Sequence, residues 1–337
     1  MPEDPPSGAG GGAWSAPLEQ LQQVLRVPVV TQLDELGVLA VLGADAVGFL
    51  NSQLTVDVNA IDPVRWQLGA YCSVKGRVAA LFEAWREEDG LRLLLPRELI
   101  EPLRLRLARF VLRAKVELRD VSAHWTVFGL TGPGMQELLQ RAGLECPGAE
   151  WTHAAQDNGA RLARVPPSPR TGARLMLLAP ADTVGQWRSR LATAAAVGAG
   201  VWWWSKIDAG LPDVVAATQE RFLPQMLNLD VLGGVHFRKG CYPGQEVVAR
   251  SQYLGKLRRR MMRGHVPQAS PGQDVSDGDG SAVGTVVIAA TAPEGGVDVL
   301  FECPSELADG APLQVGTAPA GRIRLGELPY PMINPTA

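Results

Sequence analysis

The sequence predicts an α+β protein in which two similar α+β halves precede a small C-terminal β domain. Val38 to Leu42 has the composition of a short buried strand, and a Gly43 turn and apolar residues at helical spacing follow it. The same order of strand, glycine turn and helix returns from Thr126 to Leu139. Beyond Arg260, glycine and proline become frequent and short apolar runs alternate with turn residues, which is typical of β structure.

Each half contains further strands and a helix. Short apolar runs bounded by turn residues predict strands, and apolar residues three or four positions apart predict helices with one buried face. In the first half we expect strands at 68–72, 78–85 and 91–95 and a helix from Leu99 to Phe110. In the second half we expect strands at 116–118, 161–165 and 174–178 and a helix over 182–196. In the C-terminal domain we expect strands at 284–288, 297–301 and 322–325.

These elements set the expected domain boundaries. Residues 1–30 begin with a stretch rich in proline and glycine and are expected to form a disordered tail. The first α+β half is expected over 31–115, the second over 116–255 and a C-terminal β-barrel over 256–337.

Composition and charge restrict the class of protein. The 32 basic and 35 acidic side chains give a net charge of −3, so no overall positive field attracts nucleic acid or anionic lipid. The most apolar stretch, 191–204, is shorter than the ~20 residues of a bilayer span. The four cysteines lie far apart and no secretion signal precedes them, so free thiols and a cytoplasmic location are expected.

The segment FRKGCYPGQEVVAR, Phe237 to Arg250, presents a lone cysteine on a turn. Gly240 and Gly244 permit backbone angles closed to other residues, and Pro243 stiffens the turn. The basic pair before Cys241 favours the thiolate over the thiol, so we expect a partly exposed and reactive sulfur. The alternative is a cysteine packed under the turn as a small apolar side chain. A helix is expected to follow, with Gln245 and Glu246 at its start and Arg250 along it.

Phe222 to Arg260 resembles the YgfZ-type folate-binding proteins, relatives of the glycine-cleavage T-protein, an aminomethyltransferase. Their signature K-G-C-Y-x-G-Q-E is matched by Lys239 to Glu246. Further matches at 42–58, 72–77, 202–212 and 327–331 extend the resemblance over nearly the whole chain after about Leu33. The resemblance implies a glycine-cleavage T-protein-like α+β fold, with the two halves forming a folate-binding module. It also implies that Cys241 is the functional thiol, with Lys239, Tyr242, Gln245, Glu246 and Arg250 around it.

Tetrahydrofolate, or another folate, is the cofactor that the resemblance implies. Such a site needs a slot for the flat pterin, an apolar wall and cations for the glutamate tail. Trp202 occupies the family's tryptophan position, where an indole face suits stacking. Three adjacent tryptophans cannot all lie on one face of a strand, so at least one of Trp202 to Trp204 is expected in the core. The other residues assigned to the site are Gln225 and Asn228 for the pterin edge, Lys75 and Arg77 for the tail, and Leu36.

Three roles for the Cys241 thiolate stay open. A covalent nucleophile needs a base, and the nearest histidine, His236, is expected on a strand with nothing to orient it. A metal or iron–sulfur ligand needs further ligands from a second protein, because one thiolate cannot hold a cluster. The third role is transient thiol exchange during cluster repair. The resemblance implies maintenance of iron–sulfur enzymes, including a tRNA methylthiotransferase, and with it a transient iron–sulfur cluster.

Two departures from the aminomethyltransferase pattern bear on catalysis. The strand that carries the family's catalytic acid reads Val78 to Leu81 here, without a carboxylate, and the P-x-E pterin anchor reads Pro224-Gln225-Met226. Asp57 and Glu246 are the only nearby acids that suggest themselves as replacements. We therefore expect a folate-binding accessory protein that supports tRNA methylthiolation, with a folate-dependent aminomethyltransferase as the alternative. Direct RNA binding through Arg258, Arg259 and Arg260 is less favoured because the net charge is negative.

Overall fold

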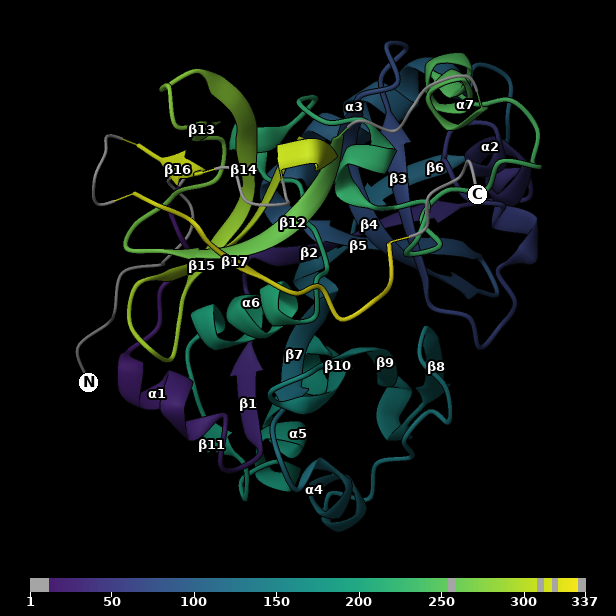
Figure 1. The fold of residues 1–337 in the computed structure, drawn as a ribbon. Coiled ribbons are helices and arrows are strands. Elements are labelled where there is room, and N and C mark those ends of the chain that lie inside the picture. Colours follow the sequence, from purple (N-terminus) through teal and green to yellow (C-terminus); the bar gives the residue numbers. More distant parts are fainter. Residues whose placement is uncertain (1–11, 254–258, 308–311, 317–320, 333–337) are drawn as a thin grey trace.

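The computed structural model describes residues 12–253, 259–307, 312–316 and 321–332. They form three β-sheets with helices packed around them, which confirms the predicted α+β class. In Figure 1 the C-terminal strands, the first sheet and the second sheet form three lobes, and α6 (Ala199–Asp208) lies between the C-terminal strands and the second sheet.

The first sheet has five antiparallel strands in the order β3-β4-β5-β2-β6. Its strands are β2 (Leu36–Leu42), β3 (Gln67–Cys72), β4 (Val78–Glu87), β5 (Gly90–Pro96) and β6 (Glu117–Asp120). Helices α2 (Ala46–Asn51) and α3 (Ile100–Val111) accompany it. These elements agree with the predicted strands and helices. Because β6 pairs with β2, the first sheet continues past the expected boundary at residue 115.

The second sheet has six strands in the order β11-β1-β7-β10-β9-β8. They are β1 (Val29–Gln32), β7 (Trp125–Thr131), β8 (Thr152–Ala155), β9 (Arg161–Ser168), β10 (Gly172–Pro180) and β11 (Ala195–Ala196). Its helices are α4 (Met135–Arg141) and α5 (Val184–Arg190), and α5 is shorter than the helix expected over 182–196. Strand β1 precedes the first sheet in the sequence but pairs with β7 of the second sheet. The two sheets therefore do not follow the expected boundary between the halves.

The C-terminal strands form one curled antiparallel sheet in the order β16-β13-β14-β15-β12-β17. They are β12 (Arg259–Val266), β13 (Asp274–Ser276), β14 (Ala282–Thr291), β15 (Val297–Pro304), β16 (Gln314–Val315) and β17 (Arg324–Gly326). Strand β14 is buried almost throughout because α6 packs against it. The small β domain expected beyond residue 256 is therefore a curled half-barrel.

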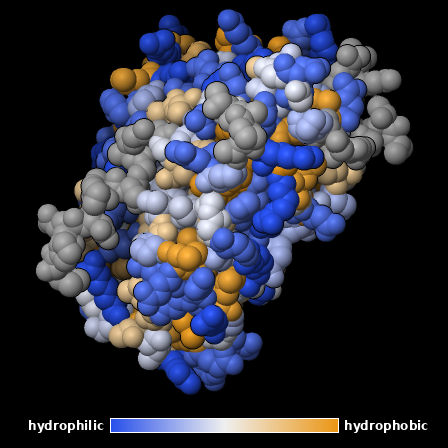
Figure 2. Space-filling model, turned by 60° about the vertical axis from the view of Figure 1, so that its left-hand side comes forward, coloured by the Kyte–Doolittle hydropathy of each residue, from blue (hydrophilic) through white to orange (hydrophobic). Residues whose placement is uncertain are grey.

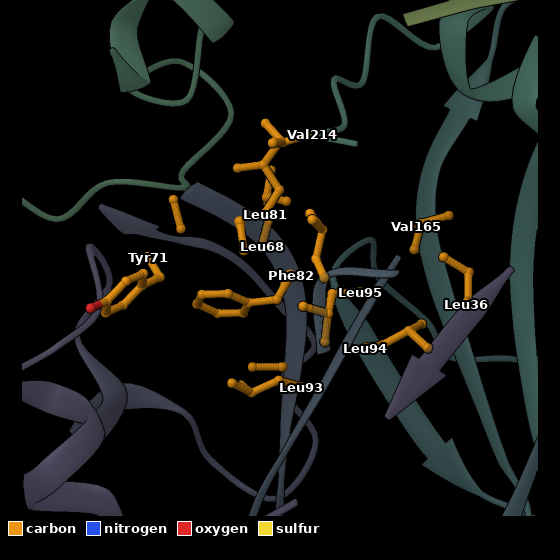
Figure 3. Packing of buried hydrophobic residues seen from close by; sticks show 14 of the residues in the cluster. Leu36, Leu68, Tyr71, Leu81, Phe82, Leu93, Leu94, Leu95, Val165 and Val214 are labelled. Carbon is orange, nitrogen blue, oxygen red and sulfur yellow. The ribbon is translucent and has the colours of Figure 1, made fainter. Parts of the chain in front are cut away.

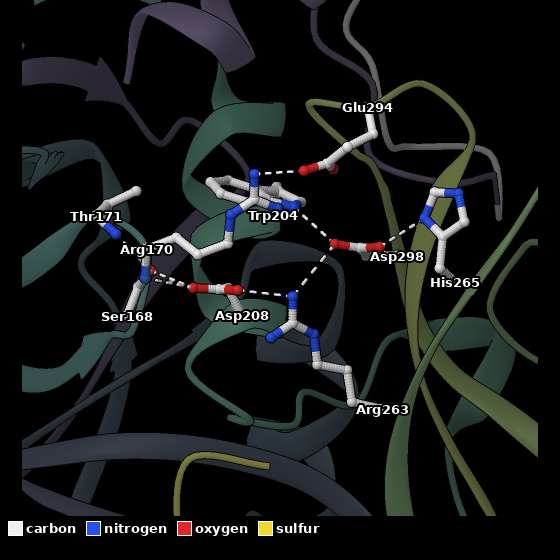
Figure 4. A network of polar contacts seen from close by, with 9 residues as sticks. All are labelled: Ser168, Arg170, Thr171, Trp204, Asp208, Arg263, His265, Glu294 and Asp298. Carbon is white, nitrogen blue, oxygen red and sulfur yellow. Dashed lines mark hydrogen bonds and ion pairs between the residues drawn. The ribbon is translucent and has the colours of Figure 1, made fainter. Parts of the chain in front are cut away.

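Helix α6 replaces the strand expected around Trp202, Trp203 and Trp204. All three tryptophans are buried on this helix, because different lobes cover its different faces. Trp204 Nε1 donates to Asp298 at 2.9 Å, and the Arg263 guanidinium lies 2.7 Å from Asp208 (Figure 4). These contacts fix the C-terminal sheet to α6.

The expectation of disorder through residue 30 is wrong for residues 12–30. Trp14 is buried and stacks on Trp203 with ring centroids 4.4 Å apart, and its backbone pairs with Ala289 and Thr291 of β14. Helix α1 (Leu18–Gln23) follows. Burial of the large apolar side chain of Trp14 orders this segment, and the amino-acid composition alone does not reveal that burial. Residues 1–11 lie outside the described residues.

No helix in the described part of the chain is both long enough and apolar enough to cross a bilayer. On the face drawn in Figure 2, apolar residues occur as small groups among hydrophilic ones.

Glu35, just before β2, makes stability depend on pH. Burial raises the pKa of its carboxyl from 4.5 to about 7, although Trp203 Nε1 donates to it. Between these two pH values the folded chain binds more protons than the unfolded chain, so stability falls as the pH rises through this window. Glu35→Gln removes the charge and keeps an acceptor for Trp203. Urea unfolding should show the variant and wild type alike near pH 4.5, and the variant more stable by about 2 kcal/mol near pH 8. A difference that does not change with pH would contradict this assignment.

Candidate functional site

Lys239 fastens the cysteine loop to the end of helix α2. Its ammonium group donates to the backbone carbonyls of Asn51, Leu54 and Val56, the last two at 2.6 and 2.9 Å. A cation at the C-terminal end of a helix also favours the helix dipole. Burial lowers the pKa of Lys239 to about 8, while Asp57 opposes the shift, so the group keeps its proton at neutral pH. Lys239 thus bonds to the end of α2 and holds the loop there, and its expected role beside the thiol stays a prediction.

Gly244 places the same loop on the turn between β3 and β4. Its φ is +78°, and a Cβ atom there would lie 2.4 Å from the Ser73 carbonyl oxygen and 2.6 Å from Gly76 Cα. Both contacts are to backbone, so only glycine allows this approach. Val247, in the first turn of the helix that follows the loop, packs on Gly76. The loop and the hairpin turn are thus in direct backbone contact.

Tyr242 seals the inner side of the loop. It is buried, its ring centroid lies 5.3 Å from Lys239 Nζ, and burial raises the pKa of its hydroxyl. Its carbonyl accepts from the Gln245 backbone N–H at 3.1 Å, where α7 (Gln245–Tyr253) begins as predicted. The aromatic ring lies under the turn and leaves the neighbouring sulfur outside.

Cys241 is exposed, as expected. Among the described residues its sulfur has no hydrogen-bond partner. Glu246 and Arg250 form an exposed pair along α7 at 3.2 Å and do not contact the thiol in the described contacts. The expected base, His236, lies on an exposed loop segment and not on a strand, because Gly233 and Gly234 turn the chain before it. The geometry presents a surface thiol without a general base beside it.

The four cysteines should differ sharply in reactivity. Cys72 and Cys303 are buried, and burial raises the pKa of each thiol to about 12, whereas Cys241 and Cys146 are exposed. Since the thiolate is the reactive form, brief iodoacetamide treatment of the native protein should modify Cys241 and Cys146 at least tenfold faster than the other two. Peptide mass spectrometry reads out each site. Equal labelling of Cys72 and Cys241 in the folded protein would refute the placement of the loop.

Trp202 and Leu36 come together in a cavity where the first and second sheets meet. The cavity volume is about 20 Å³, room for about one water, and its apolar wall includes Leu68 and Leu81, which lie side by side in Figure 3. The Arg174 guanidinium lies 4.2 Å from the Trp202 ring centroid and covers that face of the indole. Stacking of a pterin on this face therefore requires Arg174 to move.

The other four candidate folate residues lie outside this cavity. Asn228 bonds both ways to the Met261 backbone, donating at 2.9 Å and accepting at 3.2 Å, so its amide continues strand pairing. Gln225 donates to the Val248 carbonyl at 2.8 Å, while its buried carbonyl oxygen has no partner in the described structure. Arg77 donates to the Arg221 carbonyl at 2.6 Å. Lys75 is exposed on the turn that supports Gly244.

Sequence reasoning missed Glu83, an acid that lines the cavity. It lies on β4 two residues beyond Leu81, on the same face, and it lines the cavity together with Lys206, Asp213 and Arg174. Its signal was a single carboxylate within an otherwise apolar run, Val78 to Trp85. The acids nominated in its place lie elsewhere: Glu246 is exposed on α7, and Asp57 accepts from Asn59.

The cavity and the thiol loop lie at different points of one hairpin. Val78 follows the turn on which Gly244 rests, and Glu83 is five residues further along β4. At about 3.3 Å per residue this is a separation of about 16 Å. The residues singled out from the sequence thus fall into a buried polar cavity and an exposed thiol loop.

Two further features bear on metal and RNA binding. Within the described ranges no three His, Cys, Asp or Glu side chains are grouped so that they could hold a metal ion. Arg259 is paired with Glu302, and Arg260 with Asp230, so both guanidinium groups hold the fold together. Arg258 lies outside the described residues.

The fold is that of a glycine-cleavage aminomethyltransferase. The solved aminomethyltransferase T from Bartonella henselae superposes with a TM-score of 0.76 over 94% of this chain and 90% of its own, at 16% identity. No protein-family model matches the sequence. The tRNA-modifying protein YgfZ of Edwardsiella ictaluri is 30% identical over 307 residues, 89% of this chain and 91% of its own. That of Pectobacterium carotovorum is 28% identical over 310 residues, with 90% and 92% covered. The chain belongs to the YgfZ family.

Proposed function

We propose that this chain is a cytoplasmic, tetrahydrofolate-binding accessory protein that supports iron–sulfur enzymes and thereby the methylthiolation of tRNA. The observation that carries the proposal is the exposed Cys241 on a loop that Lys239 and Gly244 fix to the first half. A thiol held at the surface in a fixed position is accessible to sulfur or iron on another protein. The relatives' designation as tRNA-modifying proteins agrees with this role.

An iron–sulfur cluster would have to be shared with a client protein. Cys241 offers one thiolate, and the described residues group no further metal ligands with it. The chain's own residues therefore do not fit a resident cluster. A client such as a tRNA methylthiotransferase would supply the remaining ligands, and the chain would contribute one thiol. Direct RNA contact is not part of the proposal, since Arg259 and Arg260 are engaged in ion pairs.

The folate is proposed to bind in the cavity lined by Trp202 and Leu36. The donor set fits a pterin, because charged and apolar side chains meet there as in sites that orient small flat ligands. A cavity of about 20 Å³ holds only about one water, so binding requires the lining side chains to move apart.

Glu83 favours a second candidate function, folate-dependent aminomethyl transfer. A carboxylate on β4 that faces the cavity could stabilise positive charge on an opening folate ring. One such electrostatic group contributes roughly 3 kcal/mol to catalysis. Its position differs from that of the acid expected from the family, because it lies beyond Val78 to Leu81.

Titration calorimetry and a turnover assay separate the two functions. We expect heat on adding tetrahydrofolate to the reduced protein, and no methylenetetrahydrofolate after incubation with glycine-derived and other methylamine donors. Absence of heat would end the folate proposal. Sustained formation of methylenetetrahydrofolate would favour the transferase.

A further inference from the structure

Only one of the two carboxylate oxygens of Glu83 accepts a hydrogen bond among the described residues. Trp66 Nε1 donates to Oε2 at 2.5 Å, and the other oxygen has no partner among the described residues. Its strand is buried on both sides, and the side chain faces the cavity with Leu81. An oxygen that faces the cavity and accepts no hydrogen bond from the described residues is available to a ligand that brings N–H groups.

The cations of the cavity are committed to other partners. Lys206 is ion-paired with Asp213. Arg174 donates to Ser205 Oγ at 2.9 Å and to the Pro166 carbonyl at 3.3 Å, and it lies over Trp202. Burial raises the pKa of Glu83, while Lys206 and Arg174 oppose the shift. Both cations are near enough to act on Glu83 through space, but neither forms an ion pair with it among the described contacts.

We propose that Glu83 binds the 2-amino-4-oxopyrimidine edge of the ligand in this cavity, an assignment that rests on the proposed folate function. This edge carries two adjacent N–H donors, which match the two oxygens of a carboxylate. Beside them it carries a carbonyl acceptor, which suits Nη2 of Arg174, the guanidinium nitrogen that makes neither the bond to Ser205 nor the bond to Pro166. Tetrahydrofolate has this edge and guanosine shares it, so the two are compared as probes.

The test is the affinity of the full chain for tetrahydrofolate in Glu83→Gln. The amide keeps an acceptor for Trp66 but turns an N–H group toward the N–H groups of the ligand, so we expect at least tenfold weaker binding. The thermal midpoint should be unchanged or higher, because a buried charge is removed. Glu88→Gln, at an exposed position on the same hairpin, should bind like wild type. Equal affinity of wild type and Glu83→Gln would overturn the assignment.

A ligand-side measurement does not depend on how the variant folds. Wild type should bind a tetrahydrofolate whose 2-amino group is replaced by methyl at least tenfold more weakly than tetrahydrofolate. Equal affinity for the two would also overturn the assignment. No binding of either folate by wild type would contradict the proposed function itself. Guanosine binding that Glu83→Gln abolishes would in that case retain the role of Glu83 for the shared edge.

Discussion

Gly244→Ala is expected to lower the free energy of unfolding by about 3 kcal/mol and to release the cysteine loop from the hairpin turn. A φ of +78° disfavours alanine, and the added Cβ would meet the Ser73 carbonyl oxygen at 2.4 Å. The Ser73 oxygen and the Gly76 Cα, which the new Cβ would meet, are both backbone atoms, so the loop or the turn would have to move to relieve the clash. Urea unfolding measures the loss, and the rate of Cys241 alkylation reports on the loop.

Gly240→Ala is the matched control for this change. Gly240 lies in the same loop, yet a Cβ atom there meets nothing within 4 Å, and its φ is not in the left-handed region. We expect a stability within about 0.5 kcal/mol of wild type. If both alanine variants are equally stable, the packing of Gly244 on the turn is wrong.

Lys239→Met is expected to cost about 2 kcal/mol of stability. The substitution leaves the carbonyls of Asn51, Leu54 and Val56 without their shared donor, and unpaired buried acceptors are expensive. The loss of desolvation cost for the ammonium offsets part of this penalty. Denaturant unfolding at neutral pH measures the difference, and hydrogen exchange should rise at the end of α2.

Lys75→Met controls for the loss of a positive charge in the same region. Lys75 is exposed on the neighbouring turn and has no hydrogen bond among the described contacts, so its replacement should change stability by less than about 0.5 kcal/mol. Similar effects of the two substitutions would mean that Lys239 does not hold the loop.

Much of the fold could be predicted from local patterns. The runs that became β2 to β5 and β9 to β10 are apolar segments bounded by turn residues, and this signal does not depend on the rest of the chain. The tryptophans of α6 gave no such signal, because a helix covered on several faces has no polar side to set its period. Trp14 was missed because its partner, Trp203, lies far along the sequence.

The sequence predicted the motif of the candidate site but not the contacts that its residues make. The motif identified Cys241 and its exposure, since the glycines and the helix start are local features. It could not show that Lys239 binds carbonyls 183 to 188 residues away, because only the folded chain brings α2 beside the loop. Nor could it separate Asn228, whose amide pairs with Met261, from residues that line the cavity.

The central claim is that the exposed thiol of Cys241 is what this chain contributes to tRNA modification. The most direct test measures methylthiolated nucleosides in tRNA from a strain that depends on this copy, carrying wild type, Cys241→Ser or Cys146→Ser. Cys146 is the other exposed cysteine, so its variant controls for the loss of a surface thiol. The account predicts normal modification with Cys146→Ser and a loss of at least tenfold with Cys241→Ser at equal protein level. Full modification with Cys241→Ser would contradict it.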